Sequence, residues 1–275
     1  MSNPTFLASA EAIARNRESG ASELLAQLLP LLGDAIAAGR ETVTAVARLV
    51  CAGQPAMAPL WNACAAAVTE FQVPGRFARR RAEMDRAPRA LAKAATAALM
   101  DALAGEDQPQ LLTLSYSSSV ATALCAIVRE RPLAVICGES QPGGEGARMR
   151  DQLASAGAGA LLIADALLTT YLPTATAVLV GADAISAADW TNKCGTFGLA
   201  AAASFTGTPV YVVASRDKAQ SAALRSRMQP SREFERTPLT LATAFLTDAG
   251  IVAPPDVPAL AERYAEEVAA LVALL

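Results

Sequence analysis

The chain contains no histidine among its 275 residues, and this absence removes several kinds of functional site. General acid–base catalysis by imidazole, Ser-His-Asp triads and histidine-ligated metals are all excluded. Aromatic residues are scarce at 5%, whereas hydrophobic residues reach 53%, so the core must be built from alanine, leucine and valine. Such a composition suits closely packed helices.

Paired cysteines, a strong net charge and long apolar runs are also missing. The five cysteines are widely spaced and form no CxxC, so we expect reduced thiols, no disulfide frame, no metal and no cofactor. A net charge of −3 argues against a nucleic-acid surface. The first residues lack a signal-peptide pattern, and the apolar windows are interrupted by proline, glycine or charge. We therefore expect a soluble, cytoplasmic protein that does not cross a membrane.

Residues 1–105 have the spacing of a helical domain. Leucines recur at helical intervals between Leu24 and Ile36, and the stretches ETVTAVARLVCAG and RALAKAATAALMDALAG repeat the pattern. Gly39, Gly53 and Gly105 stand where helices would end.

Residues 106–275 change to short apolar runs that alternate with helix-like segments. The expected strands are Leu111–Leu114, Pro132–Cys137, Ala160–Ala164, Ala177–Val180 and Pro209–Ala214. Fully apolar strands separated by helices are typical of a parallel sheet that is covered on both faces. The predicted fold class is therefore α/β, with an N-terminal helical domain (1–105) followed by a parallel-sheet domain (106–275).

A polar residue follows each expected strand. These residues are Ser115, Glu139, Asp165, Asp183 and Ser215. Because ligands of parallel sheets bind beyond the carboxyl ends of the strands, we expect all five along one edge. The aspartate of the GADAI stretch then belongs to a polar rim and is not an isolated buried carboxylate.

Two strand-to-helix junctions have the chemistry of an anion site. SYSSSVATAL places four serines before a helix: Ser115, Ser117, Ser118 and Ser119. Free N–H groups at a helix start suit a phosphate, and an ordinary serine N-cap explains the pattern equally well. In NKCGTFGLAA, Asn192 and Lys193 precede a second helix start, where the lysine either meets an anion or is solvated in a turn.

Other charged segments admit both a functional and a structural explanation. Glu139 opens GESQPGGEGARMR, a Pro/Gly turn that matches no nucleotide-binding motif. Arg17, in NRESGASELL, would reach a phosphate across an interdomain cleft or simply belong to a capped helix start. Seven basic residues between Arg76 and Lys93 are interspersed with acidic ones, which indicates a solvated helix face or a partner surface.

Seven stretches, taken in order, resemble one superfamily. They are LLTLSYSSSVATAL, GESQPGGEGARM, LLIADALLTTYL, VLVGADAI, NKCGTFGLA, PVYVVAS and FERTPLTLATAFLTDAG. The superfamily comprises the alpha, beta and delta subunits of eukaryotic translation initiation factor 2B, methylthioribose-1-phosphate isomerase and ribose-1,5-bisphosphate isomerase. The resemblance runs from about Gln110 to Ile251, and more faintly from Asn16 to Leu25. It implies an N-terminal helical domain, a Rossmann-like C-terminal domain, a sugar-phosphate cleft between them, and dimers or larger homo-oligomers formed through the C-terminal domain.

The resemblance also implies roles for individual residues. In the isomerases a cysteine after the first strand and the aspartate of the GAD motif do the chemistry, and an Asn-Lys pair lines the site. These carry over to Asp183, Asn192 and Lys193, but the Thr-His-Cys of the isomerases stands here as Thr-Leu-Ser, ending at Ser115. A serine hydroxyl is a far weaker acid and nucleophile than a thiol unless a base activates it. The ESQP stretch is closer to the regulatory alpha-type subunits.

Three functions therefore stay open. The first is an initiation factor 2B subunit-like protein that binds a sugar phosphate or nucleotide in the interdomain cleft without cysteine-dependent chemistry. The second is an aldose–ketose isomerase that acts on a phosphorylated pentose of the ribose-1,5-bisphosphate or methylthioribose-1-phosphate type, with Asp183 as acid or base. The third is a partner-binding subunit whose contact surface is the basic face from Arg76 to Lys93.

Overall fold

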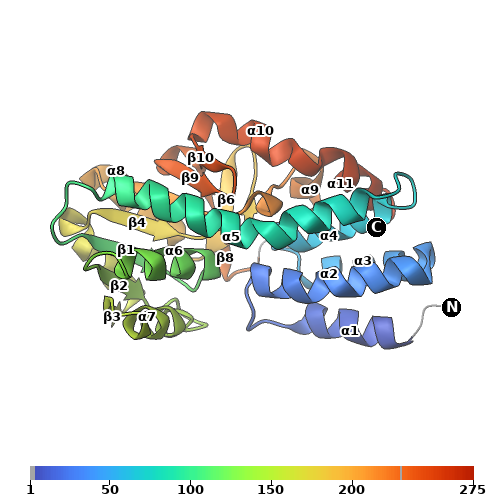
Figure 1. Ribbon diagram of the computed structural model, residues 1–275, viewed down its shortest axis with the longest axis horizontal. Coiled ribbons are helices and arrows are strands. Elements are labelled where there is room, and N and C mark those ends of the chain that lie inside the picture. Colours follow the sequence, from blue (N-terminus) through green and yellow to red (C-terminus); the bar gives the residue numbers. More distant parts are fainter. Residues whose placement is uncertain (1–3, 230) are drawn as a thin grey trace.

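The computed structural model describes residues 4–229 and 231–275, and five helices precede the first strand. They are α1 (Pro4–Arg15), α2 (Ala21–Ala38), α3 (Arg40–Gly53), α4 (Ala58–Thr69) and α5 (Arg76–Ala102). Figure 1 shows α1 to α4 gathered at one end of the molecule, while α5 continues along the sheet. The predicted N-terminal helical region is confirmed.

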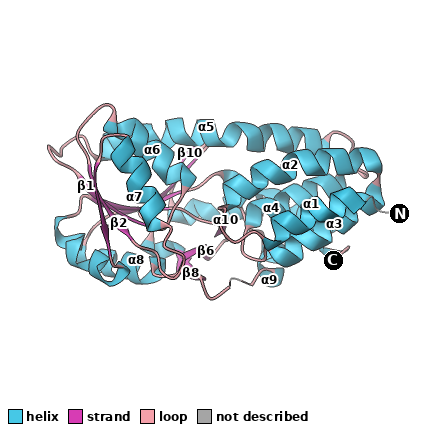
Figure 2. Ribbon diagram, turned by 90° about the horizontal axis from the view of Figure 1, so that it is seen from below, coloured by secondary structure: helices cyan, strands magenta, loops and turns pink. Residues whose placement is uncertain are grey.

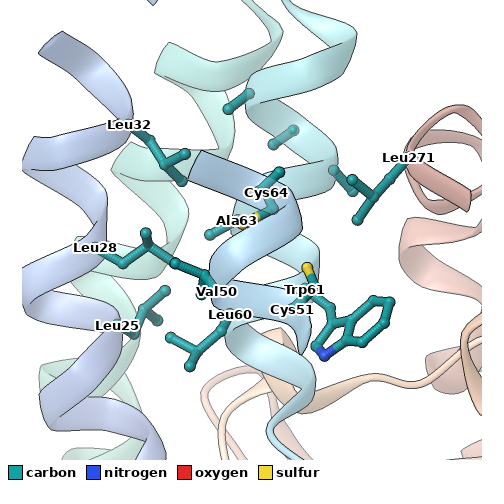
Figure 3. Packing of buried hydrophobic residues seen from close by; sticks show 14 of the residues in the cluster. Leu25, Leu28, Leu32, Val50, Cys51, Leu60, Trp61, Ala63, Cys64 and Leu271 are labelled. Carbon is teal, nitrogen blue, oxygen red and sulfur yellow. The ribbon is translucent and has the colours of Figure 1, made fainter. Parts of the chain in front are cut away.

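The core of this end is centred on α4. All twelve of its residues are buried, and its alanines let the neighbouring helices approach closely. Leu24, Leu28 and Leu32 of α2 recur every four residues and are fully buried, so one stripe of α2 faces this core. Figure 3 shows the packing of Leu28 and Leu32 beside Cys64.

Helix α2 also bears on the expected absence of a membrane span. Its 18 residues have a mean hydropathy of 1.3, so by length and composition alone it is able to cross a membrane, contrary to the sequence-based expectation. Its buried leucines belong to the same core cluster as the buried valines of α3 and Leu60 of α4.

The second region is a seven-stranded sheet in the order β10-β9-β7-β4-β1-β2-β3. Its strands are β1 (Gln110–Leu114), β2 (Ala134–Gly138), β3 (Gly159–Ile163), β4 (Ala177–Val180), β7 (Val210–Val213), β9 (Ala244–Thr247) and β10 (Gly250–Val252). All neighbours pair in parallel except β9 and β10. The five expected strands are β1, β2, β3, β4 and β7, so the parallel α/β sheet is confirmed; β9 and β10 were not expected.

Helices cover this sheet, which Figure 2 separates clearly from the helical end. The remaining α-helices are α6 (Ser118–Val128), α7 (Gly146–Ser155), α8 (Thr196–Thr206), α9 (Ala222–Arg227), α10 (Val257–Ala261) and α11 (Ala265–Val272). Of these, α9 and α11 pack in the core of the helical end and not on the sheet. Short 3₁₀ helices are η1 (Asp165–Thr174), η2 (Arg216–Lys218), η3 (Leu239–Leu241), η4 (Pro254–Asp256) and η5 (Glu262–Tyr264).

A small antiparallel sheet was missed by the sequence patterns. It consists of β5 (Ala184–Ile185), β6 (Asp189–Lys193) and β8 (Phe234–Pro238). Asn192 and Lys193 end β6 and precede α8, which starts at Thr196, where the sequence indicated a helix start. Strand β6 is polar in sequence yet buried throughout, so it has none of the alternation by which strands are recognised.

The two regions share elements. Phe77 and Met84 of α5 lie in the helical core, whereas Leu91 and Leu99 of the same helix pack with the sheet. Near the other end of the chain, Leu271 of α11 packs in the helical core. The hydrophobic cores therefore do not separate at a single point of the chain, and the domain boundary at residue 105 stays a prediction.

Candidate ligand-binding site

A cavity of about 280 Å³ opens where the helical end meets the ends of β1, β4 and β6. Five residues that the sequence singled out line it together: Arg17, Ser115, Asp183, Asn192 and Lys193. The helical end contributes the turn from residue 16 to 20 and the segment from 53 to 57. The cavity therefore lies between the two regions, as the resemblance implied.

The helical wall is held by buried amide groups. Asn16 Oδ1 accepts the backbone N–H of Ser19 at 2.9 Å, which fixes the turn before α2. Gln54, only 5% exposed, donates to the carbonyl of Asn16 at 2.7 Å and ties this turn to the end of α3. Arg17 is exposed, and its Nη1 donates to the carbonyl of Ala14 at 2.8 Å. Its guanidinium lies at the mouth of the cavity without a carboxylate partner among the described residues.

Asp183 is fixed by its backbone and free at its side chain. Its N–H donates to Thr191 O at 2.8 Å, and its carbonyl accepts the N–H of Ala58 at the start of α4 at 3.1 Å. The carboxylate has no hydrogen bond or ion pair within the described part of the chain. Burial raises the pKa of Asp183, and the nearby Lys218 and Lys193 oppose the rise only in part. A half-buried carboxyl with a raised pKa is suited to proton transfer.

Lys193 lies beside this carboxylate and is itself paired. It is 3% exposed at the end of β6, and its Nζ is 2.7 Å from Glu145 Oε1 and 3.8 Å from Glu233 Oε2. Asn192 Nδ2 donates to Thr196 Oγ1 at 3.0 Å, which orients the amide. Both acidic partners of Lys193 line the cavity.

A smaller chamber adjoins the main cavity, and Gly20, Tyr116 and Asn192 border both. Lys218, 5% exposed at the end of η2, lines this chamber, and its ammonium has no hydrogen bond or ion pair to any residue that the structure describes. The chamber also borders the first residues of two helices, α2 and α6. Helix N-termini and an unpaired ammonium both attract anions, so this chamber has the chemistry of a phosphate site.

The serines that precede α6 divide between different environments. Ser117 and Ser118 line the small chamber, and Ser117 Oγ also accepts the N–H of Val120 at 3.4 Å as the N-cap. Gly181 permits this arrangement, because a Cβ there would lie 2.8 Å from Ser117 Cβ. Ser119 does not line the main cavity; it borders a separate cavity of about 240 Å³, together with Ser215.

Ser115, at the family's cysteine position, is held in an unusual conformation. Its φ is +68°, a left-handed value that costs about 1 kcal/mol or more in a residue other than glycine. Its N–H donates to Ser140 Oγ, and Asp165 accepts the N–H groups of Ser140 at 2.7 Å and Gln141 at 2.8 Å. Asp165 therefore anchors the loop after β2 and does not line a cavity.

Glu139 lies outside the lining of the cavities. Its backbone bonds to Ile163 and Gly146, and a Cβ on Gly146 would fall 1.7 Å from Gly138 O, so the chain is tightly packed here. The acidic side chain that reaches the cavity from this loop is Glu145, six residues later. Of the five polar residues that follow the expected strands, two line the main cavity: Ser115 and Asp183.

Sequence patterns also missed the residues that join the two walls. The guanidinium of Arg148 on α7 lies 3.8 Å from the ring centre of Tyr116 and donates to Glu23 Oε1 on α2 at 2.5 Å. The hydrogen bond from Arg148 lowers the pKa of Glu23 although burial opposes it. Arg148 stands in a stretch that resembles the superfamily, but no spacing rule assigns its partner. Within residues 4–229 and 231–275, no three acidic or cysteine side chains are grouped to hold a metal ion.

A comparison with protein-family models shows to which family the chain belongs. The model of the initiation factor 2 subunit family matches residues 10–234. The chain belongs to this family. Residues of both the helical region and the parallel sheet lie within the match, so both walls of the cavity are part of the shared architecture.

Curated relatives in the family include enzymes. The chain is 31% identical over 179 residues to methylthioribose-1-phosphate isomerase of Chloroflexus aurantiacus, covering 54% of this chain and 52% of that protein. It is 30% identical over 174 residues to 5-deoxyribose 1-phosphate isomerase of Moorella thermoacetica, covering 53% and 50%. The chain thus spans about half the length of the curated relatives it matches.

Solved structures show the same fold. Translation initiation factor eIF-2B of Pyrococcus horikoshii OT3 superposes with a TM-score of 0.77 at 24% identity, covering 92% of this chain and 98% of that chain. A chain of the tetrameric eIF2B-beta2-delta2 complex from C. thermophilum gives a TM-score of 0.73 at 17% identity, with 94% of each chain covered. At these identities the likeness supports the fold alone.

Proposed function

We propose that the chain is an aldose–ketose isomerase of a phosphorylated pentose, with Asp183 as its acid and base. The observation that carries this proposal is the unpaired carboxyl of Asp183, whose pKa is raised by burial, beside two buried lysines. The names of the curated relatives support the same substrate class, because both are isomerases of pentose 1-phosphates.

The ligand lies between two positive groups. Lys193 stands in the main cavity and Lys218 in the adjoining chamber, and both ammoniums act on the carboxyl of Asp183. A pentose with a phosphate at each end places one phosphate at each lysine and its sugar carbons beside Asp183. The N-termini of α2 and α6, although capped by Glu23 and Ser117, add their dipoles to the site at the Lys218 end. This arrangement favours a bisphosphorylated pentose over a monophosphate.

The isomerisation needs no co-reactant. The protonated form of Asp183, which a raised pKa favours, gives its proton to the ring oxygen as the bond from that oxygen to C1 breaks. The resulting carboxylate then takes the proton of the 2-hydroxyl while hydrogen moves with its electron pair from C2 to C1, which leaves a ketone at C2. Asp183 ends protonated, as it began. The chain has no histidine to share these steps, and Ser115 supplies a hydroxyl that hydrogen-bonds the sugar.

A second candidate is ligand binding without turnover. Ser115 supplies no thiol, and Lys193 is already occupied by the carboxylate of Glu145. Both observations favour an initiation factor 2B subunit-like protein that holds a sugar phosphate or nucleotide. We infer that the chain forms homo-oligomers in either case, supported by the assembly of its structural relative.

Turnover separates the two candidates. Ribose 1-phosphate and ribose 1,5-bisphosphate are offered to the purified protein, and formation of the ketose phosphate is followed by ¹³C NMR. Asp183→Asn should lower kcat by about 10² to 10⁴ while both sugars still bind, because only the proton transfer is removed. Asp151→Asn, which neutralises an exposed carboxylate on α7, is the matched control. Undiminished turnover in Asp183→Asn would refute its role, and binding without turnover in the natural protein would favour the second candidate.

The lysine in the small chamber tests the substrate class. Lys218→Met should weaken binding of the bisphosphate by about tenfold or more and leave the monophosphate less affected, because one phosphate loses its counter-charge. Equal losses for both sugars, measured by calorimetry, would place the single phosphate of a monophosphate in this chamber instead.

A further inference from the structure

Among the described residues that line the main cavity, Lys193 is the one cation that is almost fully buried, and carboxylates surround it. Glu145 Oε1 lies 2.7 Å from its Nζ, and Glu233 Oε2 lies 3.8 Å away. The side chains of these two glutamates are 31% and 52% exposed, whereas that of Lys193 is 3% exposed. A ligand anion that approaches this ammonium therefore meets two negative charges around one positive charge.

The pairing of Glu145 is incomplete. Its Oε1 bonds to Lys193, but its Oε2 is buried and has no hydrogen-bond partner in the described residues. A buried carboxylate oxygen without a partner is costly, so this arrangement is weaker than a fully bonded ion pair. Glu145 also follows Gly143 and Gly144, the second of which has a φ of +72°, so the preceding turn is built from the residues that restrict the backbone least.

The other charged residues of the cavity do not offset the negative charge of the two glutamates beside Lys193. The lining contains four acidic residues, Glu18, Glu145, Asp183 and Glu233, and three basic ones, Arg17, Arg148 and Lys193. Arg148 is already bonded to Glu23, which lies outside this lining. Even with Asp183 protonated, as in the proposed reaction, the carboxylates of Glu18, Glu145 and Glu233 outnumber Arg17 and Lys193, the cations that are not bonded to Glu23.

We infer that Glu145 is a built-in competitor for Lys193, which an incoming phosphate must displace. The inference rests on the proposed function in that a phosphorylated ligand uses this cavity, and it names the residue that sets the affinity and selectivity of the site. A neutral sugar does not need Lys193 and leaves the pair intact. An anion binds only by replacing the carboxylate, which weakens its net affinity by the strength of that pair.

The test compares variants that differ by one carboxylate. Glu145→Gln keeps the shape of the side chain and removes its charge, so ribose 1-phosphate should bind about tenfold tighter by calorimetry. Glu233→Gln, at the longer distance, should give a smaller gain. Asp151→Asn removes one charge from α7, the helix that follows Glu145; its side chain is 67% exposed, and the substitution should change nothing. The affinity for unphosphorylated ribose should be equal in all of them.

Inorganic phosphate separates this inference from the proposed function. If no pentose phosphate binds to any variant but inorganic phosphate binds more tightly to Glu145→Gln, the competition stands and the proposed function fails. If pentose phosphates bind the natural protein and Glu145→Gln equally, or bind the variant more weakly, the competition is refuted and the function survives. If neither variant binds any of these anions, both are refuted.

A crystal structure of the natural protein soaked in inorganic phosphate gives a second measurement that does not depend on a variant. We expect phosphate against Lys193 Nζ, with the carboxylate of Glu145 turned away. Phosphate bound in the cavity with the 2.7 Å pair unchanged would overturn the inference.

Discussion

Two groups of buried charge in this chain are arranged in opposite ways. Between α5 and α11, Glu267 is 1% exposed and accepts hydrogen bonds from Arg76 at 2.9 Å and Arg80 at 2.7 Å. In the cavity region, Asp183 and Lys218 have no hydrogen bond or ion pair at their charged ends within the described chain. The first group holds two helices together, and the second leaves charge available to a ligand.

This difference separates the charged residues that stabilise the fold from those that are available to a ligand. Arg76 and Arg80 begin the basic run that the sequence assigned to a solvated face or a partner surface, but their side chains are only 23% and 14% exposed. They point inward to the last helix, so that interpretation is wrong at these two positions. Structural charges have partners from another element, whereas Asp183 and Lys218 are left without hydrogen bonds or ion pairs in the described chain, at a cost in stability.

Breaking the paired group should give the largest effect on stability. Glu267→Gln leaves two arginines without their shared carboxylate and should lower the free energy of unfolding by about 3 kcal/mol at pH 7, measured by urea denaturation. Glu266→Gln, on the exposed side of the same helix, is the control and should change stability by less than about 0.5 kcal/mol. Equal effects of the two substitutions would contradict a structural role for the ion pairs.

The pH dependence of this effect follows from the pKa of Glu267. Burial raises it, but the hydrogen bonds from Arg80 and from the backbone, together with the charges of Arg80 and Arg76, outweigh burial and hold the pKa below its ordinary value of 4.5. A lowered carboxyl pKa contributes stability that is present above the ordinary value and is lost as the pH falls. The deficit of Glu267→Gln should therefore shrink as the pH is lowered below 4.5.

Removing charge from the unpaired group should have the opposite sign. Asp183→Asn replaces a half-buried carboxylate that lacks a hydrogen bond or ion pair in the described chain and should raise the free energy of unfolding by about 2 kcal/mol at pH 7. Since the pKa of Asp183 is raised, its carboxylate costs stability at neutral pH, and this gain should vanish below the ordinary value of 3.8. Asp189→Asn is the matched control: Asp189 accepts a hydrogen bond from Ser186 at 2.7 Å and pairs with Arg225, so its loss should destabilise the protein.

Much of the fold could be predicted because apolar spacing determines it locally. Leu24, Leu28 and Leu32 indicated a helix by their period, and the five parallel strands of the main sheet were visible as apolar runs between helix-like segments. Strand β6 was invisible because its buried face is polar: Asp189 and Lys193 are stabilised there by partners far away in sequence. Hydrophobic periodicity carries no information about such partners.

The sequence predicted several residues that line the site, but it did not predict which of them contact one another. Strand ends pointed to Ser115 and Asp183, and helix starts to Asn192 and Lys193, because a parallel sheet collects these positions at one edge. The same rule failed for Glu139 and Ser215, whose neighbourhoods depend on how the following loops fold back. That Glu145 holds Lys193 is a contact across 48 residues, which no local pattern specifies.

We expect the smallest change in stability from Lys218→Met, and its sign should differ from that of Lys193→Met. Lys218→Met keeps the length of the side chain and removes a buried ammonium that has no hydrogen bond or ion pair in the described chain. The lost attraction to Asp183 and Asp217 offsets part of the relieved desolvation, so the variant should be stabilised by no more than about 1 kcal/mol. Lys193→Met removes an ammonium that neutralises Glu145 and leaves that buried carboxylate alone, so it should destabilise the protein by a similar or larger amount. Both are measured by urea denaturation at pH 7 without ligand. If Lys218→Met destabilises the protein as Lys193→Met does, the ammonium of Lys218 has a structural partner. The distinction between paired and unpaired charge would then fail at the small chamber, where it matters most for phosphate binding.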